Sequence, residues 1–232
     1  MRYVSLFILL CLGISGSGVA AQQNKTVVEL YTSQGCSSCP PADALLTQLA
    51  GRDDVIALAL HVDYWDYIGW RDIFGDPKFT ARQHSYARAA GAATIYTPQM
   101  VVGGQDHVIG SKPMAVMDLL AQHRKVAPVV RLSATRAGQM VQVSAPAAIG
   151  NPGDMVVQLV RYLPDQTVSI ERGENAGKSI KYSNIVRDWQ TIARWDGTTS
   201  LSLTAQADGP ESVVVIIQRD GHGPILAAVE LP

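Results

Sequence analysis

The sequence predicts an α/β domain with the element order βαβαββα, followed by an all-β, sandwich-like domain of antiparallel strands. In the first half of the chain, short apolar runs alternate with segments of helical periodicity, which is typical of parallel strands joined by crossover helices. In the second half, strand-like runs recur between glycine, proline and aspartate turn signals, which is typical of an antiparallel sandwich. We therefore expect a signal peptide at residues 1–21, the α/β domain at residues 22–126 and the β domain at residues 127–232.

Residues 1–21 have the pattern of a secretory signal peptide. A weakly basic start at Arg2 precedes an apolar stretch over residues 4–14, and small residues at positions 19–21 provide a cleavage site. A membrane-spanning helix needs about 20 apolar residues, and this run is shorter. We expect an exported protein, periplasmic or secreted, with no membrane partner once the signal is removed.

The composition narrows the choice of partners and of chemistry. The formal net charge is -1 and no long run of one charge occurs, so neither nucleic acid nor a membrane surface is expected as a partner. Hydrophobic residues make up 47% of the chain, which argues against disorder. Once Cys11 has left with the signal peptide, Cys36 and Cys39 are the remaining cysteines. A single close pair in an oxidising compartment fits a catalytic dithiol better than a structural framework of several bridges.

The first half contains strand and helix signals in alternation. The run VIALALH at residues 55–61 is continuously apolar, as expected of a strand covered on both faces. Asp76 and Pro77 provide an N-cap and a first-turn proline for the helix that follows. The strands are expected at residues 27–31, 55–61, 99–102 and 107–109, and the helices at residues 42–50, 77–90 and 112–124. Helical crossovers between parallel strands and a final antiparallel hairpin give the minimal thioredoxin-like core.

The second half is predicted to consist of short strands. They are expected at residues 129–135, 140–144, 155–163, 167–171, 179–185, 190–195, 200–205, 212–218 and 225–231. Residues 173–179 superficially resemble a phosphate-binding loop, but the spacing is one residue short and no helix follows. We expect a hairpin turn in that segment.

A C-x-x-C motif, Cys36-Ser37-Ser38-Cys39, lies between the first predicted strand and the first predicted helix. This order of elements is the thioredoxin-type redox arrangement, so the sequence predicts a thiol-disulfide oxidoreductase. The unpaired N–H groups at a helix start favour a thiolate, so Cys36 is expected to be the nucleophile and Cys39 the resolving thiol. The Ser37 and Ser38 hydroxyls could donate to that thiolate and make the pair more oxidising. No cofactor is expected, because the cysteines themselves carry the electrons, and the expected partner is a protein or a small thiol.

Residues 31–39 resemble the thioredoxin and glutaredoxin superfamily, and they look more like a glutaredoxin because Gly35 stands where thioredoxins usually have tryptophan. Thr97 and Pro98 match the superfamily's cis-proline turn, and the resemblance implies that this turn faces the cysteines and binds the substrate backbone. The resemblance also makes Glu29 a candidate proton acceptor for the resolving thiol. A structural ion pair or a polar strand edge is the alternative for Glu29, because its register differs by one residue from the thioredoxin pattern.

A second resemblance covers nearly the whole mature chain. The phrases VVELYTSQGCSSCPPAD, LALHVDYWDYIGWRDIF, YTPQMVVGG and RGENAGKSIKYSNIVRDW are similar to those of a family of secreted bacterial proteins known only as a domain of unknown function. This resemblance implies a thioredoxin-like fold with an extra C-terminal β domain and export from the cytoplasm of a Gram-negative bacterium. It implies no substrate, so the functional expectation depends on the dithiol.

Two other interpretations of the cysteine pair stay open. One is a periplasmic metal-binding module, with Cu(I) as a suitable ion, in which a methionine or a histidine such as His61 joins the two thiolates. The other is a non-enzymatic binding protein in which the disulfide only stiffens a loop. Tyr64 and Trp65, together with Tyr67 and Trp70, either form an aromatic rim that binds substrate near the cysteines or pack the loop onto the body of the protein.

Overall fold

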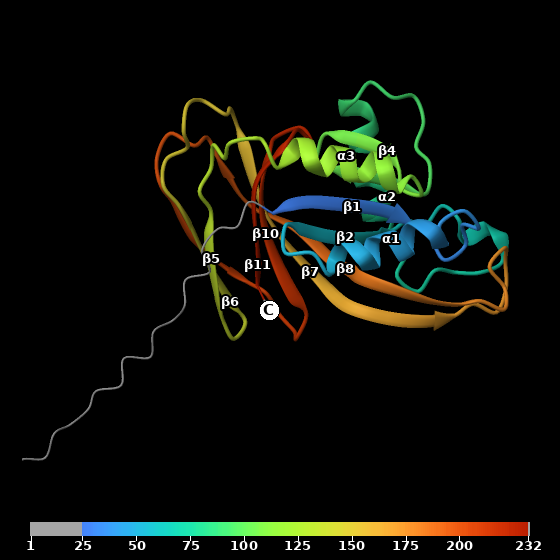
Figure 1. Cartoon of the computed structure of the whole chain (residues 1–232). Coiled ribbons are helices and arrows are strands. Elements are labelled where there is room, and N and C mark those ends of the chain that lie inside the picture. The colour runs from blue at the N-terminus through green and yellow to red at the C-terminus, as the bar shows by residue number, and fades with distance from the viewer. Residues whose placement is uncertain (1–24, 232) are drawn as a thin grey trace, which may run out of the picture.

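The computed structural model describes residues 25–231, and the predicted signal peptide lies outside this range. The described chain forms a sheet of eight strands and a sheet of three strands, and helices cover one end of the larger sheet (Figure 1). Within the same range, no helix is both long enough and apolar enough to cross a membrane.

The first half of the chain forms one end of the larger sheet. Its elements are β1 (Thr26–Thr32), α1 (Pro40–Ala50), β2 (Val55–His61), the short 3-10 helix η1 (Asp66–Ile68), α2 (Pro77–Ala89), β3 (Gln99–Val102), β4 (Asp106–Ile109) and α3 (Pro113–His123). β1 pairs in parallel with β2 and antiparallel with β3, and β3 pairs antiparallel with β4. β2 and β3 have the bounds that the apolar runs predict.

Helices cover both faces of β1 and β2, and every residue of these two strands is buried. Side chains alternate along β1, so Val28 and Leu30 pack in the cluster that includes α1 and α3. Val27 and Tyr31 point to the other face and pack with α2. This alternation decides which residues of β1 can lie near the start of α1.

The second half consists of strands. These are β5 (Ser133–Ala137), β6 (Met140–Ala145), β7 (Met155–Ser169), β8 (Ser179–Trp195), β9 (Leu201–Gln206), β10 (Ser212–Arg219) and β11 (Ile225–Leu231). The smaller sheet has the order β5-β6-β9 and stacks on β7, β10 and β11. The side chains between these two layers are apolar and include Leu132, Val143, Val157, Val215 and Val229.

The second half does not form the separate domain that the sequence predicts. β8 pairs in parallel with β2 at Ala59 and Ile185, so one sheet runs through both halves in the order β11-β10-β7-β8-β2-β1-β3-β4. β7 and β8 are single strands of 15 and 17 residues, whereas the sequence predicts two shorter strands in place of each. Residues 164–167 of β7 are exposed, and this Pro-Asp-Gln-Thr sequence resembles a turn although the backbone stays extended. The boundary near residue 127 therefore separates two kinds of element but not two sheets.

Candidate functional site

Cys36 and Cys39 form a disulfide directly before α1, with their Cα atoms 5.4 Å apart. Cys39 is the N-cap residue and Pro40 is the first residue of the helix. The sequence places Cys36 at the helix start, but it lies in the preceding turn, where its N–H donates to Ser33 and its carbonyl accepts from Cys39. The Cys36 Sγ lies 3.4 Å from the Ser38 Oγ, as the proposed hydroxyl donor requires.

The disulfide is shielded from solvent. Both cysteines have a relative exposure of 0%, although Ser37 and Ser38 between them are exposed. Two segments from elsewhere in the chain cover the cysteine loop, which we define as residues 33–39. One is the segment after β2, and the other is the hairpin tip, which we define as residues 170–178 between β7 and β8.

The segment after β2 contacts the cysteine loop through several residues. Trp70 donates from Nε1 to the Gln34 Oε1 at 2.8 Å. Gly35 leaves little room for a side chain, because a Cβ atom there would lie 3.0 Å from the Ile68 Cδ1 and 3.1 Å from the Trp65 Cβ. Trp65 and Ile68 therefore pack directly against the residue that precedes Cys36.

Asn175 attaches the hairpin tip to the cysteine loop. Its Nδ2 donates to the Gln34 and Cys36 carbonyl oxygens, both at 2.9 Å, and the residue is 1% exposed. The Ser37 N–H donates to the Glu174 Oε2 at 3.3 Å. The hairpin turn predicted at residues 173–179 thus belongs to the surroundings of the cysteines.

A buried carboxyl group lies one helical turn after Cys39. The Asp43 N–H donates to the Cys39 carbonyl at 3.1 Å, and residues four apart share one face of a helix. The Thr32 hydroxyl donates to the Asp43 Oδ1 at 2.8 Å, whereas the Asp43 Oδ2 has no hydrogen-bond partner among the described residues. Burial raises the pKa of Asp43 to about 7, although His61 and the Thr32 hydrogen bond oppose that rise.

His61 and Asp72 form a second buried pair close to Asp43. The His61 Nδ1 lies 2.7 Å from the Asp72 Oδ2, and the His61 Nε2 has no partner among the described residues. Asp72 also accepts from the Gln34 and Phe74 N–H groups. Burial opposes ionisation of Asp72, but His61 and these hydrogen bonds outweigh it and hold the pKa of Asp72 below its usual value.

The structure does not bring Glu29 to the cysteines. Glu29 points to the α2 face of β1, whereas the cysteines lead into α1 on the other face. Its carboxylate accepts from the Arg82 Nε at 2.7 Å and Nη2 at 3.0 Å, and from the Tyr86 hydroxyl at 2.6 Å. Glu29 is therefore half of a buried ion pair, and the assignment as proton acceptor for Cys39 is corrected.

The predicted substrate-binding residues lie partly beside the cysteine loop. The Thr97–Pro98 peptide bond is cis. Trp65, which packs on Gly35, donates from Nε1 to the Thr97 Oγ1 at 2.8 Å and so links this turn to the cysteine loop. The Tyr64 hydroxyl instead donates to the Gln83 Oε1 on α2 at 3.3 Å.

An exposed aromatic surface adjoins this link. Tyr67 stacks on Trp65, with ring centroids 6.4 Å apart, and is 81% exposed. The loop aromatics therefore divide into two groups, since Trp65 and Trp70 hold the cysteine loop while Tyr67 faces solvent.

The structure does not support the metal-site interpretation. In the part of the chain that it describes, no three His, Cys, Asp or Glu side chains lie close enough together to bind a metal ion. His61, the candidate third ligand, is engaged with Asp72 instead.

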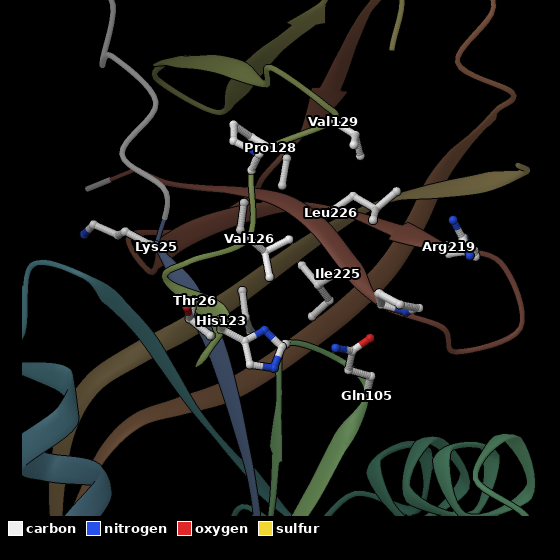
Figure 2. A pocket seen from close by; sticks show the side chains of 16 residues that line it. Lys25, Thr26, Gln105, His123, Val126, Pro128, Val129, Arg219, Ile225 and Leu226 are labelled. Atoms are coloured by element: carbon white, nitrogen blue, oxygen red, sulfur yellow. The ribbon is translucent and has the colours of Figure 1, made fainter. Parts of the chain in front are cut away.

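A cavity of about 320 Å³ lies at the opposite end of β1, where Thr26 and Val27 line it (Figure 2). Its other walls include Val126 and Ile225, with His123, which pairs with Asp106 at 2.7 Å. A seven-residue strand is about 23 Å long, so this cavity is remote from the cysteine loop.

Sequence reasoning missed three residues of the site. Asp43 carries a usable signal, because it is an acidic residue between the buried Ala42 and Leu46 and four positions after Cys39. Asp72 and Asn175 carry no comparable local signal, since their roles depend on chain segments that meet only in the folded structure.

Comparisons with known proteins identify a family. A family model described as "Protein of unknown function (DUF1223)" matches residues 27–218. A crystal structure of a protein from Agrobacterium tumefaciens has 34% sequence identity and a TM-score of 0.78, covering 91% of this chain and 96% of that one. HBP35 of Porphyromonas gingivalis has 15% identity and a TM-score of 0.58, covering 92% of this chain and 76% of that one, which is a likeness of fold alone. No curated protein matches the chain. The chain therefore belongs to the DUF1223 family of proteins of unknown function.

Proposed function

We propose that this protein is an exported bacterial thiol-disulfide oxidoreductase whose Cys36–Cys39 pair exchanges electrons with a protein or a small thiol. The observation that carries the proposal is a closed disulfide at the start of α1 with the buried Asp43 carboxyl group one helical turn away. The order β1-α1-β2-α2-β3-β4-α3 supports a thioredoxin-like assignment for the first half. The signal-like residues 1–21 support export.

The exchange begins when a partner thiolate attacks the Cys36 Sγ. The Cys36–Cys39 bond breaks, a mixed disulfide forms between the partner and Cys36, and Cys39 leaves as a thiolate. Asp43 is largely protonated below about pH 7, so it can supply a proton to the leaving Cys39 sulfur. Ser38 is placed to donate a hydrogen bond to Cys36 when that sulfur is charged.

A second partner thiolate then completes the reaction. It attacks the partner's own sulfur in the mixed disulfide and releases Cys36 as a thiolate. The partner has lost two electrons and holds a disulfide, while Cys36 and Cys39 have gained two electrons and are thiols or thiolates. The same steps in reverse oxidise the cysteine pair and reduce the partner.

A polypeptide partner would lie along the partly exposed Thr97 and Trp65 and the exposed Tyr67, whereas Pro98 is buried and only shapes the turn. The Trp65–Thr97 hydrogen bond holds two of these residues in a fixed relation to the cysteine loop. Tyr67 adds an exposed ring beside them, and aromatic surfaces of this kind contribute much of the binding energy at protein interfaces.

Trapping of the mixed disulfide tests the proposal. Cys39→Ser removes the sulfur that would resolve the intermediate, so the variant incubated with an oxidised peptide that contains one disulfide should form a covalent adduct at Cys36. Dithiothreitol should release the adduct, and Cys36→Ser should form none. If Cys39→Ser forms no adduct although its Cys36 is a free thiol, the proposed chemistry is wrong.

A further inference from the structure

We propose that the hairpin tip is a lid over the Cys36–Cys39 disulfide, and that Asn175 is the positioning residue that holds the lid closed. This inference rests on the proposed exchange function and adds to it a barrier that the partner must overcome. It begins from the burial of both cysteines, since a disulfide with 0% exposure cannot be attacked until something moves.

Asn175 makes the principal contact between the tip and the cysteine loop. An asparagine amide has two N–H donors, and both are used here, one on the Gln34 carbonyl and one on the Cys36 carbonyl. The Asn175 Oδ1 accepts from the Lys178 Nζ at 2.8 Å, which orients the amide. The backbone of the nucleophilic cysteine is therefore held by a residue 139 positions later in the chain.

The tip is a compact unit with few other attachments to the cysteine loop. Within it, the Gly177 N–H donates to the Ile170 carbonyl at 2.8 Å, and the Ala176 N–H donates to the Gly173 carbonyl at 3.2 Å. Residues 171–174 and 176–178 of the tip are exposed. Outside the Asn175 bonds, the hydrogen bond between tip and loop within residues 25–231 is the exposed one from the Ser37 N–H to Glu174.

The base of the hairpin is anchored differently. Val168, Ile180 and Tyr182 pack with Phe74 in a buried apolar cluster, which also includes Ile170 at the edge of the tip. Gly173 and Gly177 lie beyond this cluster and have φ angles of 77° and 80°, a conformation that favours glycine. The tip can therefore lift by breaking its polar contacts and the packing of Gly173 against Ile68 and Trp70, while the apolar base stays packed. Such a movement is a local opening rather than global unfolding.

The rate at which a small reductant opens the disulfide tests this inference. Oxidised full-length mature protein is mixed with excess dithiothreitol, quenched with acid, alkylated and analysed by mass spectrometry over time. Asn175→Ala and Asn175→Asp should each raise the rate about tenfold, since both remove the two donated hydrogen bonds. Asn151→Ala is the matched control. The Asn151 Oδ1 accepts one hydrogen bond in an exposed turn, but this turn lies at the opposite end of β7 from the tip. The Asn151→Ala substitution should therefore leave the reduction rate unchanged.

The dependence of the rate on urea separates a lid from a general loss of stability. Local opening exposes little surface, so the rate in wild type and in Asn175→Ala should change little at urea concentrations well below the unfolding transition. A steep rise with urea in both proteins would show that reduction needs global unfolding and would overturn the lid.

Two further outcomes separate the lid from the proposed function. If Cys39→Ser traps a partner but Asn175→Ala is reduced at the wild-type rate, the lid is wrong and the exchange function stands. If the disulfide of every variant resists reduction until urea unfolds the protein, both proposals fall.

Discussion

The N–H of Asp43 donates to the carbonyl of Cys39, which sets the buried Asp43 carboxyl group one helical turn after the proposed resolving cysteine. The same carboxyl group has one oxygen bound by the Thr32 hydroxyl and one oxygen without a partner among the described residues. A carboxyl group in these surroundings is stable when neutral, so it can give a proton to a sulfur and take it back near pH 7.

Asp43 should make the oxidised protein less stable as the pH rises. The folded state keeps the Asp43 proton up to about pH 7, whereas the unfolded state loses it near pH 4. The contribution of Asp43 to the free energy of unfolding is therefore fully present below about pH 4. This contribution declines as the pH rises from about 4 to about 7 and is lost above about pH 7, a change of up to about 4 kcal/mol. Asp43→Asn should remove this decline, which urea unfolding at pH 5 and pH 8 would measure. Equal pH slopes in the two proteins would contradict a raised pKa.

Asp43→Asn should also change the pH profile of exchange. In the wild type, the proton for the departing Cys39 sulfur becomes scarce above about pH 7, so the rate per attacking thiolate should fall there. The variant should be slower below pH 7 and lack this fall. Stopped-flow rates corrected for the thiolate fraction of the reductant provide the measurement. Identical pH profiles in the wild type and the variant would show that Asp43 has no part in the mechanism.

Glu29→Gln should destabilise the protein without altering exchange. The substitution leaves the buried Arg82 guanidinium without its carboxylate, which typically costs about 3–5 kcal/mol. Glu29 lies on the α2 face of β1, so the pH profile of exchange should match that of the wild type. Thermal unfolding and exchange rates measured on the same sample would check both statements. An altered pH profile would show that Glu29 takes part in exchange after all.

Gly35→Ala should disturb the packing of the cysteine loop. The added methyl would lie 3.0 Å from the Ile68 Cδ1, and crowding of this kind costs about 1–3 kcal/mol. Gly51→Ala, at the end of α1, is the matched control, because its nearest neighbour would be 3.6 Å away. Urea unfolding of both variants tests the contrast, and equal losses of stability would contradict it.

Trp65→Phe should weaken exchange with a polypeptide more than exchange with a small thiol. The substitution removes the hydrogen bond to Thr97, and with it the fixed position of the turn beside the cysteine loop. Thr97→Val removes the same bond from the other side, whereas Thr97→Ser can retain it. We expect KM for a dithiol peptide to rise several-fold in the first two variants and little in the third. Equal effects on a peptide and on glutathione would argue against a binding surface here.

The sequence predicts much of the fold near the cysteines because the signals there are local. The run at residues 55–61 is apolar throughout and forms β2 at the predicted bounds, and the C-x-x-C motif lies at the start of α1. The faces of β1 could not be assigned in the same way. Alternation tells that Glu29 and Leu30 point to opposite sides, but which side carries α1 depends on the topology of the sheet.

The contribution of the second half of the chain could not be predicted from local patterns. Polar residues in β7 resemble a turn in the sequence. The predicted strands are therefore shorter than the observed ones, and the predicted hairpin does not reach the first half of the chain. Asn175 bonds to Cys36 only because the β7–β8 hairpin extends past α1, with β8 beside the helix, where the Ser183 and Thr47 hydroxyl oxygens lie 3.0 Å apart. Because such contacts depend on strand length and sheet order, the sequence around Asn175 does not predict them.

The reduction potential of the Cys36–Cys39 pair decides whether the pair is redox-active or structural. It is measured by equilibrating the native protein with glutathione buffers of known ratio and quantifying the reduced fraction by alkylation. We expect a reversible transition at a potential above thioredoxin's, which is about -270 mV. A potential below about -300 mV, or a pair that does not equilibrate in the folded protein, is the property of a structural disulfide and would contradict it.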